Sequence, residues 1–174
     1  MEKIFYTDKS NYLSSEEALQ YVLSEFFGVK KPKIVRNENG KPFLKGCEER
    51  IFFSVSHTDK RLFIAVSDEN VGLDAESLSR SVDYPPILRR FPAEERSEIR
   101  SKEDFLRHWT AKESAVKWMG GTLANDLGKI EFIKDRLFYG AIEFPVFLVF
   151  FQRDGHLLAV CSERNFENAE FIPI

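Results

Sequence analysis

The stretch "HWTAKESAVKWMG", residues 108–120, continues an amphipathic helix that begins a few residues earlier. At about 100° per residue, one arc of this helix collects most of the large apolar side chains and the terminal glycine: Phe105, Leu106, Trp109, Val116 and Gly120. Glu113 lies inside this arc, and Lys112 lies at its edge. An unpaired buried charge costs several kcal/mol. The pattern therefore predicts that Lys112, Glu113 and Lys117 line a charged cleft rather than a core.

A plainer interpretation also fits two of these residues. Glu113 and Lys117 are four positions apart, in the order that stabilises an exposed helix by ~0.2–0.5 kcal/mol. Such a pair needs no ligand. The place of Glu113 in the apolar arc favours the cleft, because the pair alone does not offset the cost of burial, whereas a nearby metal ion or phosphate would.

Length and composition describe a chain that can build a core of its own. A single unit of 174 residues buries roughly 70% of its unfolded surface. Charges of both signs are mixed along the chain, and the net charge is -3. This balance argues against a dedicated nucleic-acid binder. Cys47 and Cys161 lack CxxC spacing, so neither a zinc site nor a redox motif is indicated and a reduced, cytoplasmic setting is expected.

The N-terminal segment carries no sign of an export signal. The N-terminal "MEKIFYTDKSNY" has no basic segment followed by an apolar one, and no apolar run approaches the length of a membrane span. We expect a protein that is not bound to a membrane.

The chain alternates helical and strand-like segments. "SSEEALQYVLSEFFG" (14–28) opens with a capping signature and ends at a glycine, which predicts a helix. Further helices are expected over 92–100 and through the opening stretch. Short β-rich runs, separated by turn formers, read as antiparallel strands beginning near residues 33, 41, 51, 62, 71, 129, 136, 146 and 157.

This order indicates an internal repeat. "LFIAVSDEN" (62–70) and "HLLAVCSERN" (156–165) align Ala65 with Ala159, and both upstream helices end at a glycine. We therefore predict an α+β fold of two pseudo-symmetric halves, 1–70 and 71–174, each a helix with an antiparallel sheet. A ligand site is expected in the cleft between them.

Two carboxylates in "GLDAE" suit a metal ion. Alternate residues of a strand share a face, so Asp74 and Glu76 point the same way with Cα atoms about 7 Å apart. Magnesium takes oxygen ligands and needs only one or two carboxylates beside a substrate phosphate. Gly72 on the same face would let a ligand approach closely. The alternative is a strand end that simply faces solvent.

"FSVSHT" (53–58) ends a strand with Ser56 and His57. A histidine at such a place is either a surface side chain or a functional group, and the spacing alone leaves both open. HExxH, Walker A, GxGxxG and nucleophile-elbow motifs are absent, so zinc proteases, P-loop enzymes, dinucleotide folds and α/β-hydrolases lack support.

Taken in order, "GKPFL", "FSVSHT", "VGLDAE" and "FLRHWTAKESAVKWMG" resemble the 4′-phosphopantetheinyl transferases, in particular their surfactin-type, single-chain pseudo-dimeric branch. The resemblance covers residues 39–122. It implies two similar α+β halves that hold coenzyme A between them. The first predicted helix departs from the family, because it is acidic and apolar where relatives often carry basic side chains.

The resemblance also implies site residues. The magnesium set would be Asp74, Glu76 and Glu113. The coenzyme would contact Ser56 and His57, Lys117 at a phosphate, Lys112 in the same cleft, and Lys41 of "GKP" near the adenosine. Glu113 and Lys117 would be the catalytic pair, with Glu113 or a water as the base.

The implied reaction is magnesium-dependent transfer of the phosphopantetheine arm of coenzyme A to a serine of an acyl or peptidyl carrier protein, with release of 3′,5′-ADP. A non-catalytic module that binds coenzyme A or the carrier, and a magnesium-dependent phosphohydrolase, are the alternatives. Because this family's carriers are acidic, "ILRRFPAEERSEIR" (87–100), with its arginines and Phe91, is a candidate docking patch. We expect a monomer that binds neither nucleic acid nor membrane.

Overall fold

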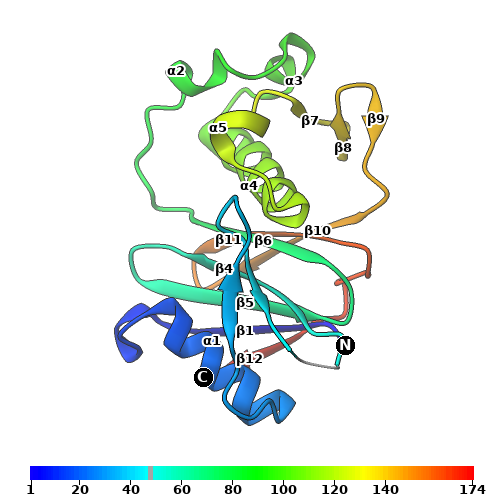
Figure 1. Ribbon diagram of the computed structural model, residues 1–174. Helices are drawn as coiled ribbons and strands as arrows, with labels where there is room; N and C mark the ends of the chain where they lie inside the picture. Colours follow the sequence, from blue (N-terminus) through cyan, green and yellow to red (C-terminus); the bar gives the residue numbers. More distant parts are fainter. Residues whose placement is uncertain (47–48) are drawn as a thin grey trace.

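The computed structural model describes residues 1–46 and 49–174, so Cys47 lies outside the described residues. The first sheet has the strand order β12-β1-β5-β4 (Figure 1). Its strands are β1 (Lys3–Asp8), β4 (Phe52–His57), β5 (Arg61–Ser67) and β12 (Glu170–Pro173). The β1–β5 and β4–β5 pairs are antiparallel, whereas β12 runs parallel to β1. The last strand of the chain therefore forms one edge of this sheet, next to the first strand.

Helix α1 (Ser15–Phe27) covers this sheet. Ser14 caps it by accepting a hydrogen bond from the Glu17 N–H, and Gly28 ends it in the left-handed conformation with φ 66°. One face of the helix packs on the sheet in a buried cluster that includes Leu19, Val22 and Phe5. The predicted helix over 14–28 is confirmed, and its cap and terminal glycine are the signals that located it.

The second sheet has the order β10-β11-β6 and is antiparallel throughout. Its strands are β6 (Val71–Ser77), β10 (Phe147–Arg153) and β11 (His156–Ser162). Helix α4 (Lys102–Met119) lies on it, on the far side of the two sheets from α1 (Figure 1). A capping box of Ser101 and Asp104 begins the helix, and Gly120 ends it.

Shorter elements surround these layers. They are the 3-10 turn η1 (Lys9–Asn11), the hairpin of β2 (Ile34–Arg36) and β3 (Pro42–Leu44), helices α2 (Pro85–Leu88), α3 (Ala93–Glu98) and α5 (Leu123–Asp126), and a small sheet of β7 (Ile130–Ile133), β8 (Arg136–Tyr139) and β9 (Ile142–Glu143). Of the helices within the described residues, none is both long and apolar enough to cross a membrane.

The predicted α+β class with antiparallel sheets is confirmed. The order of elements also repeats: β1, α1, a hairpin, β4 and β5 correspond to β6, α4, a small sheet, β10 and β11. Ala65 and Ala159 lie in the central strands of the two sheets, between neighbours on both sides. The division at residue 70 stays a prediction. Strands β1, β9 and β12 and helices α2 and α5 were not expected from the sequence.

Candidate active site

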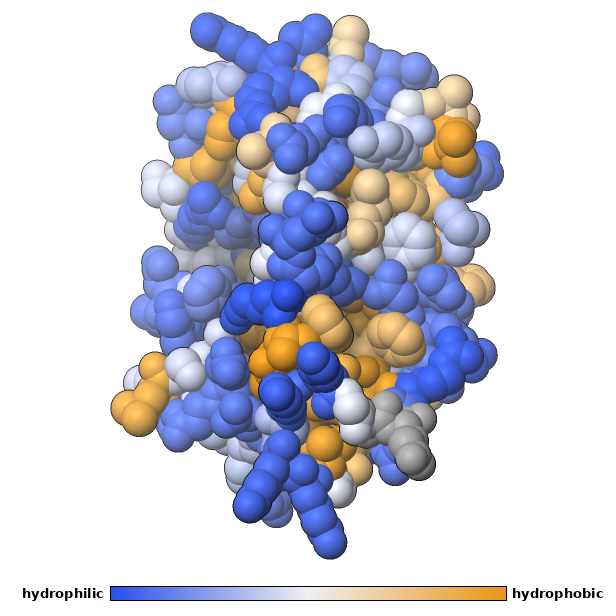
Figure 2. Space-filling view, in the orientation of Figure 1, coloured by the Kyte–Doolittle hydropathy of each residue, from blue (hydrophilic) through white to orange (hydrophobic). Residues whose placement is uncertain are grey.

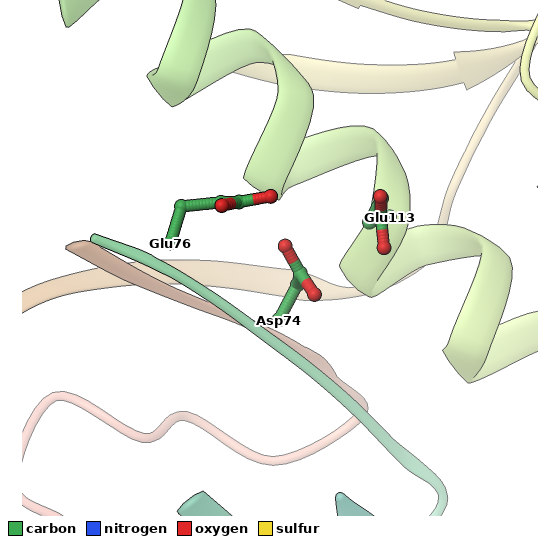
Figure 3. Close-up of side chains that lie close together, drawn as sticks. All are labelled: Asp74, Glu76 and Glu113. Atoms are coloured by element: carbon green, nitrogen blue, oxygen red, sulfur yellow. The ribbon is translucent and has the colours of Figure 1, made fainter. Parts of the chain in front are cut away.

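Three carboxylates from two elements meet at the junction of β6 and α4. Asp74 and Glu76 extend from β6 toward Glu113 on α4 (Figure 3). One oxygen from each lies within 4.8 Å of the others. Asp74 is 3% exposed, and the other two are half-buried. The expected acidic set is thus brought together.

Gly72 makes this meeting possible. A Cβ at this position would lie 2.0 Å from the backbone oxygen of Ser114 and 2.4 Å from the backbone nitrogen of Trp118. Only glycine therefore allows α4 to rest on β6 at this point. The expectation that Gly72 makes room for a ligand is wrong, because helix α4 fills that space.

Asp74 has one satisfied oxygen and one without a partner. Its Oδ1 accepts hydrogen bonds from Ser56 Oγ at 3.0 Å and Lys117 Nζ at 2.7 Å. Its Oδ2 is buried with no hydrogen-bond partner in the described structure. A buried orphan acceptor is costly unless a ligand meets it, and a cation held with Glu76 and Glu113 would do so.

Glu76 is held from both sides. Its Oε1 accepts from Arg80 Nη1 at 2.5 Å and from Trp109 Nε1 at 3.1 Å. Burial raises the pKa of Glu76, and Arg80 opposes that rise. Arg80 therefore partly balances the charge of the cluster.

The Glu113 carboxyl has a strongly raised pKa. Burial, with the added negative charges of Asp74 and Glu76, raises the pKa of Glu113 to about 8, although Lys117 opposes the rise. Like charges this close disfavour full ionisation. The donor set is all oxygen, the chemistry that magnesium prefers, so these residues fit the expected ion.

Two cavities adjoin the cluster, and His57 lines both. The first, of about 280 Å³, lies between α1, the β2–β3 hairpin and β4, and its walls include Leu19, Phe53, Arg36 and Lys117. The second, of about 870 Å³, is polar and includes Glu76, Arg80 and His156. Figure 2 shows one face of the molecule, which is mostly hydrophilic with an apolar area below its centre.

A profile of the 4′-phosphopantetheinyl transferase superfamily matches residues 70–161, more than half of the chain. The chain belongs to this superfamily. In this superfamily member, the matched segment contains Lys117 and all three carboxylates of the cluster.

Curated relatives carry the same name. The chain is 34% identical over 91 residues to 4′-phosphopantetheinyl transferase gsp of Aneurinibacillus migulanus, covering 49% of this chain and 37% of the relative. It is 34% identical over 115 residues to L-aminoadipate-semialdehyde dehydrogenase-phosphopantetheinyl transferase of Xenopus laevis, covering 56% and 38%. For AcpT of Escherichia coli K12 the identity is 29% over 122 residues, covering 66% and 60%. The superfamily member thus spans between about a third and three fifths of these relatives' lengths.

The remaining residues expected to bind coenzyme in this superfamily member differ in how accessible they are. His57 is exposed between the two cavities, and Lys117 lines the first cavity while it binds Asp74. Ser56 is 6% exposed, and its hydroxyl is already bonded to Asp74.

Lys41 lines the first cavity, and its ammonium is bonded to residues that do not line that cavity. The Nζ atom donates to Asn70 Oδ1 at 2.7 Å, Trp118 O at 3.0 Å and Val71 O at 3.5 Å. Burial lowers the pKa of Lys41 to about 8. In this structure the Lys41 ammonium therefore ties the end of α4 to the start of β6.

Lys112 is a correction. It was expected in the charged cleft, but its side chain is fully buried. Its ammonium donates to Glu95 Oε2 at 2.7 Å and lies 3.7 Å from the centre of the Phe91 ring. Burial lowers the pKa of Lys112, and Glu95 opposes this. Phe91 is itself 3% exposed, so it also leaves the expected docking patch.

Sequence reasoning missed Arg80, Trp109 and Glu95. Trp109 and Arg80 hold Glu76, whereas Glu95 pairs with Lys112 and contacts His108. Glu76 and Arg80 are four residues apart, a spacing that predicts contact only on a helix. Because Glu76 lies near the end of a strand, the spacing did not predict this ion pair. For Glu95, a lysine in an apolar arc does signal that a buried acid must exist elsewhere.

Proposed function

We propose that this chain transfers the phosphopantetheine arm of coenzyme A to a serine hydroxyl of an acyl or peptidyl carrier protein, releasing 3′,5′-ADP, and that it does so as a surfactin-type enzyme with magnesium. One observation carries the proposal. Three carboxylates, with the orphan oxygen of Asp74 among them, lie beside Lys117 where two cavities adjoin. A cytoplasmic monomer remains part of the proposal.

The two cavities suit the two limbs of coenzyme A, whose pyrophosphate lies between adenosine and pantetheine. The first cavity offers apolar walls such as Leu19 and Phe53, with Arg36 as a cation, and suits the nucleotide. The second is larger and polar, which suits the amide-containing arm and the incoming serine. His57, on both walls, would contact a phosphate between them.

The reaction forms a bond from the serine oxygen to the β-phosphorus and breaks the bridge to the α-phosphate. Magnesium bound by Asp74, Glu76 and Glu113 would neutralise pyrophosphate charge. Lys117 and His57 would hold non-bridging oxygens, a kind of contribution often worth about 10²–10³ in rate. Glu113, directly or through a water, would accept the serine proton.

Incubation with coenzyme A, magnesium and an apo carrier protein tests the proposal through the intact mass of the carrier. We expect the carrier to gain one phosphopantetheine, with Glu113→Gln as the inactive control. Coenzyme A cleavage without carrier would indicate the phosphohydrolase. Coenzyme binding without either reaction would indicate the binding module.

A further inference from the structure

The two main sheets meet through side chains of β4. Ser54 and Ser56 lie on one face of this strand and are 5% and 6% exposed. Ser54 Oγ accepts the Leu73 N–H at 2.9 Å, and Ser56 Oγ accepts the Ala75 N–H at 3.1 Å. Because β6 is the edge strand of its sheet, these hydroxyls take the place of a neighbouring strand for two of its backbone groups.

The two serines differ in one contact. Ser56 Oγ also donates to Asp74 Oδ1 at 3.0 Å. In the part of the chain that the structure describes, Ser54 Oγ has no bond to the carboxylate cluster. The pair is therefore a natural comparison, in which one residue joins the sheets and the other joins them and also holds a carboxylate.

Ser56 supplies the more permanent of the two contacts to Asp74. Lys117 is 30% exposed and lines the first cavity, so a substrate phosphate would compete for its ammonium. Ser56 is buried and neutral, and its hydroxyl is already fixed by the Ala75 N–H. It can hold Oδ1 of Asp74 whether or not a phosphate is bound, while Oδ2 has no hydrogen-bond partner among the described residues.

We infer that Ser56 is a positioning residue for divalent-cation binding rather than a contact to the coenzyme. It orients the Asp74 carboxylate from the first sheet, and so links the wall of the first cavity to the cation site. Second-layer partners of metal ligands typically contribute about 10–100-fold in metal affinity. The inference rests on the magnesium site of the proposed function and not on carrier transfer itself.

Binding of Mn²⁺ in the absence of substrate tests this inference. The electron-spin resonance signal of the free ion measures how much Mn²⁺ is bound. For Ser56→Ala we expect the dissociation constant to rise about tenfold or more. Ser54→Ala should lose similar stability but keep the wild-type constant. Asp74→Asn shows how far the Mn²⁺ dissociation constant rises when a proposed ligand is lost. Ser56→Thr, which keeps the hydroxyl, should recover most of the Mn²⁺ affinity.

Coenzyme A binding separates the two interpretations of Ser56. Calorimetry without metal should give Ser56→Ala the wild-type coenzyme affinity, and its transfer activity should need more magnesium at an unchanged KM for coenzyme A. Equal Mn²⁺ constants for the two alanine variants, or weakened metal-free coenzyme binding by Ser56→Ala alone, would overturn the inference. Wild-type protein that binds Mn²⁺ in this pattern but transfers nothing would overturn the proposed function alone.

Discussion

Lys112 and Glu113 are neighbours in the sequence but have different environments. Lys112 is sealed against Glu95, whereas Glu113 faces Asp74 and Glu76. Both are charged side chains in or beside the apolar arc of α4, and their charges are balanced in different ways. A buried cation with a carboxylate partner belongs to the core, while three carboxylates this close favour either a proton on one of them or a bound cation.

Removing one partner of the buried Glu95–Lys112 ion pair should destabilise the fold strongly. We expect Lys112→Met to lower the free energy of unfolding by about 3–5 kcal/mol, because the buried Glu95 loses its ammonium partner and keeps only its contact with His108. The double change Glu95→Leu with Lys112→Met should recover much of this. Urea denaturation measures both. The surface pair Arg50–Glu69 is the control, and Arg50→Ala there should cost less than about 1 kcal/mol. A small loss for Lys112→Met would contradict this assignment.

The three carboxylates should act as one unit. Asp74→Ala, Glu76→Ala and Glu113→Gln are each expected to abolish most transfer while unfolding stays cooperative, because all three are proposed to hold one ion. Double variants should then lose little more than the single ones. Steady-state rates at fixed magnesium measure this. Losses that add independently would argue against a shared ion.

At the scale of elements, β6 and α4 form the site together, and the contact between them depends on one glycine. Gly72 faces the backbone of α4, and Lys41 joins the end of that helix to the start of β6. The carboxylates add to this contact, because Asp74 accepts a hydrogen bond from Lys117 and Glu76 accepts one from Trp109. The geometry of the proposed site therefore also depends on Gly72 and Lys41, which lie outside the carboxylate cluster.

Gly72→Ala should be severe. Its Cβ would lie 2.0 Å from a backbone oxygen of α4, so the helix must move and take Glu113 with it. We expect a loss of about 1–3 kcal/mol or more in the free energy of unfolding, together with weakened Mn²⁺ binding. Gly128→Ala is the matched control, since its nearest contact would be Arg90 O at 3.6 Å. Equal effects of the two changes in denaturation and Mn²⁺ titration would refute the close-contact explanation.

At the scale of the whole molecule, surface charge differs from what counting residues suggests. Glu95 is buried with Lys112, so it does not offset the exposed arginines around α2 and α3. Arg89, Arg90, Arg96 and Arg100 are all exposed. The candidate docking patch is thus more basic than the sequence indicates, and less apolar because Phe91 is buried.

Reversing Arg89 and Arg90 to glutamate should raise the KM for an acidic carrier and leave coenzyme A binding unchanged. The effect should shrink as added salt screens the charges. Lys31→Glu with Lys33→Glu makes the same charge change elsewhere on the surface and should alter neither value. Carrier kinetics over a range of ionic strength provide the measurement. Wild-type kinetics at low salt would place docking on another surface.

Sequence alone determined the elements whose signals are local. Helices α1 and α4 carry their own caps, periodicity and terminal glycines, and Asp74 and Glu76 share a strand face by alternation. The family's motifs added Glu113 to that pair. These features depend on residues a few positions apart, so backbone geometry and the motif were sufficient.

Only the tertiary structure decided which distant groups meet. β12 joins β1 from the other end of the chain, Glu95 is the partner of Lys112, Ser56 holds Asp74, and helix α4 rather than a ligand fills the space at Gly72. No short spacing encodes such contacts, because they depend on how the layers pack. A buried charge or a small residue in a strand indicates that a neighbour exists, and the fold determines which neighbour it is.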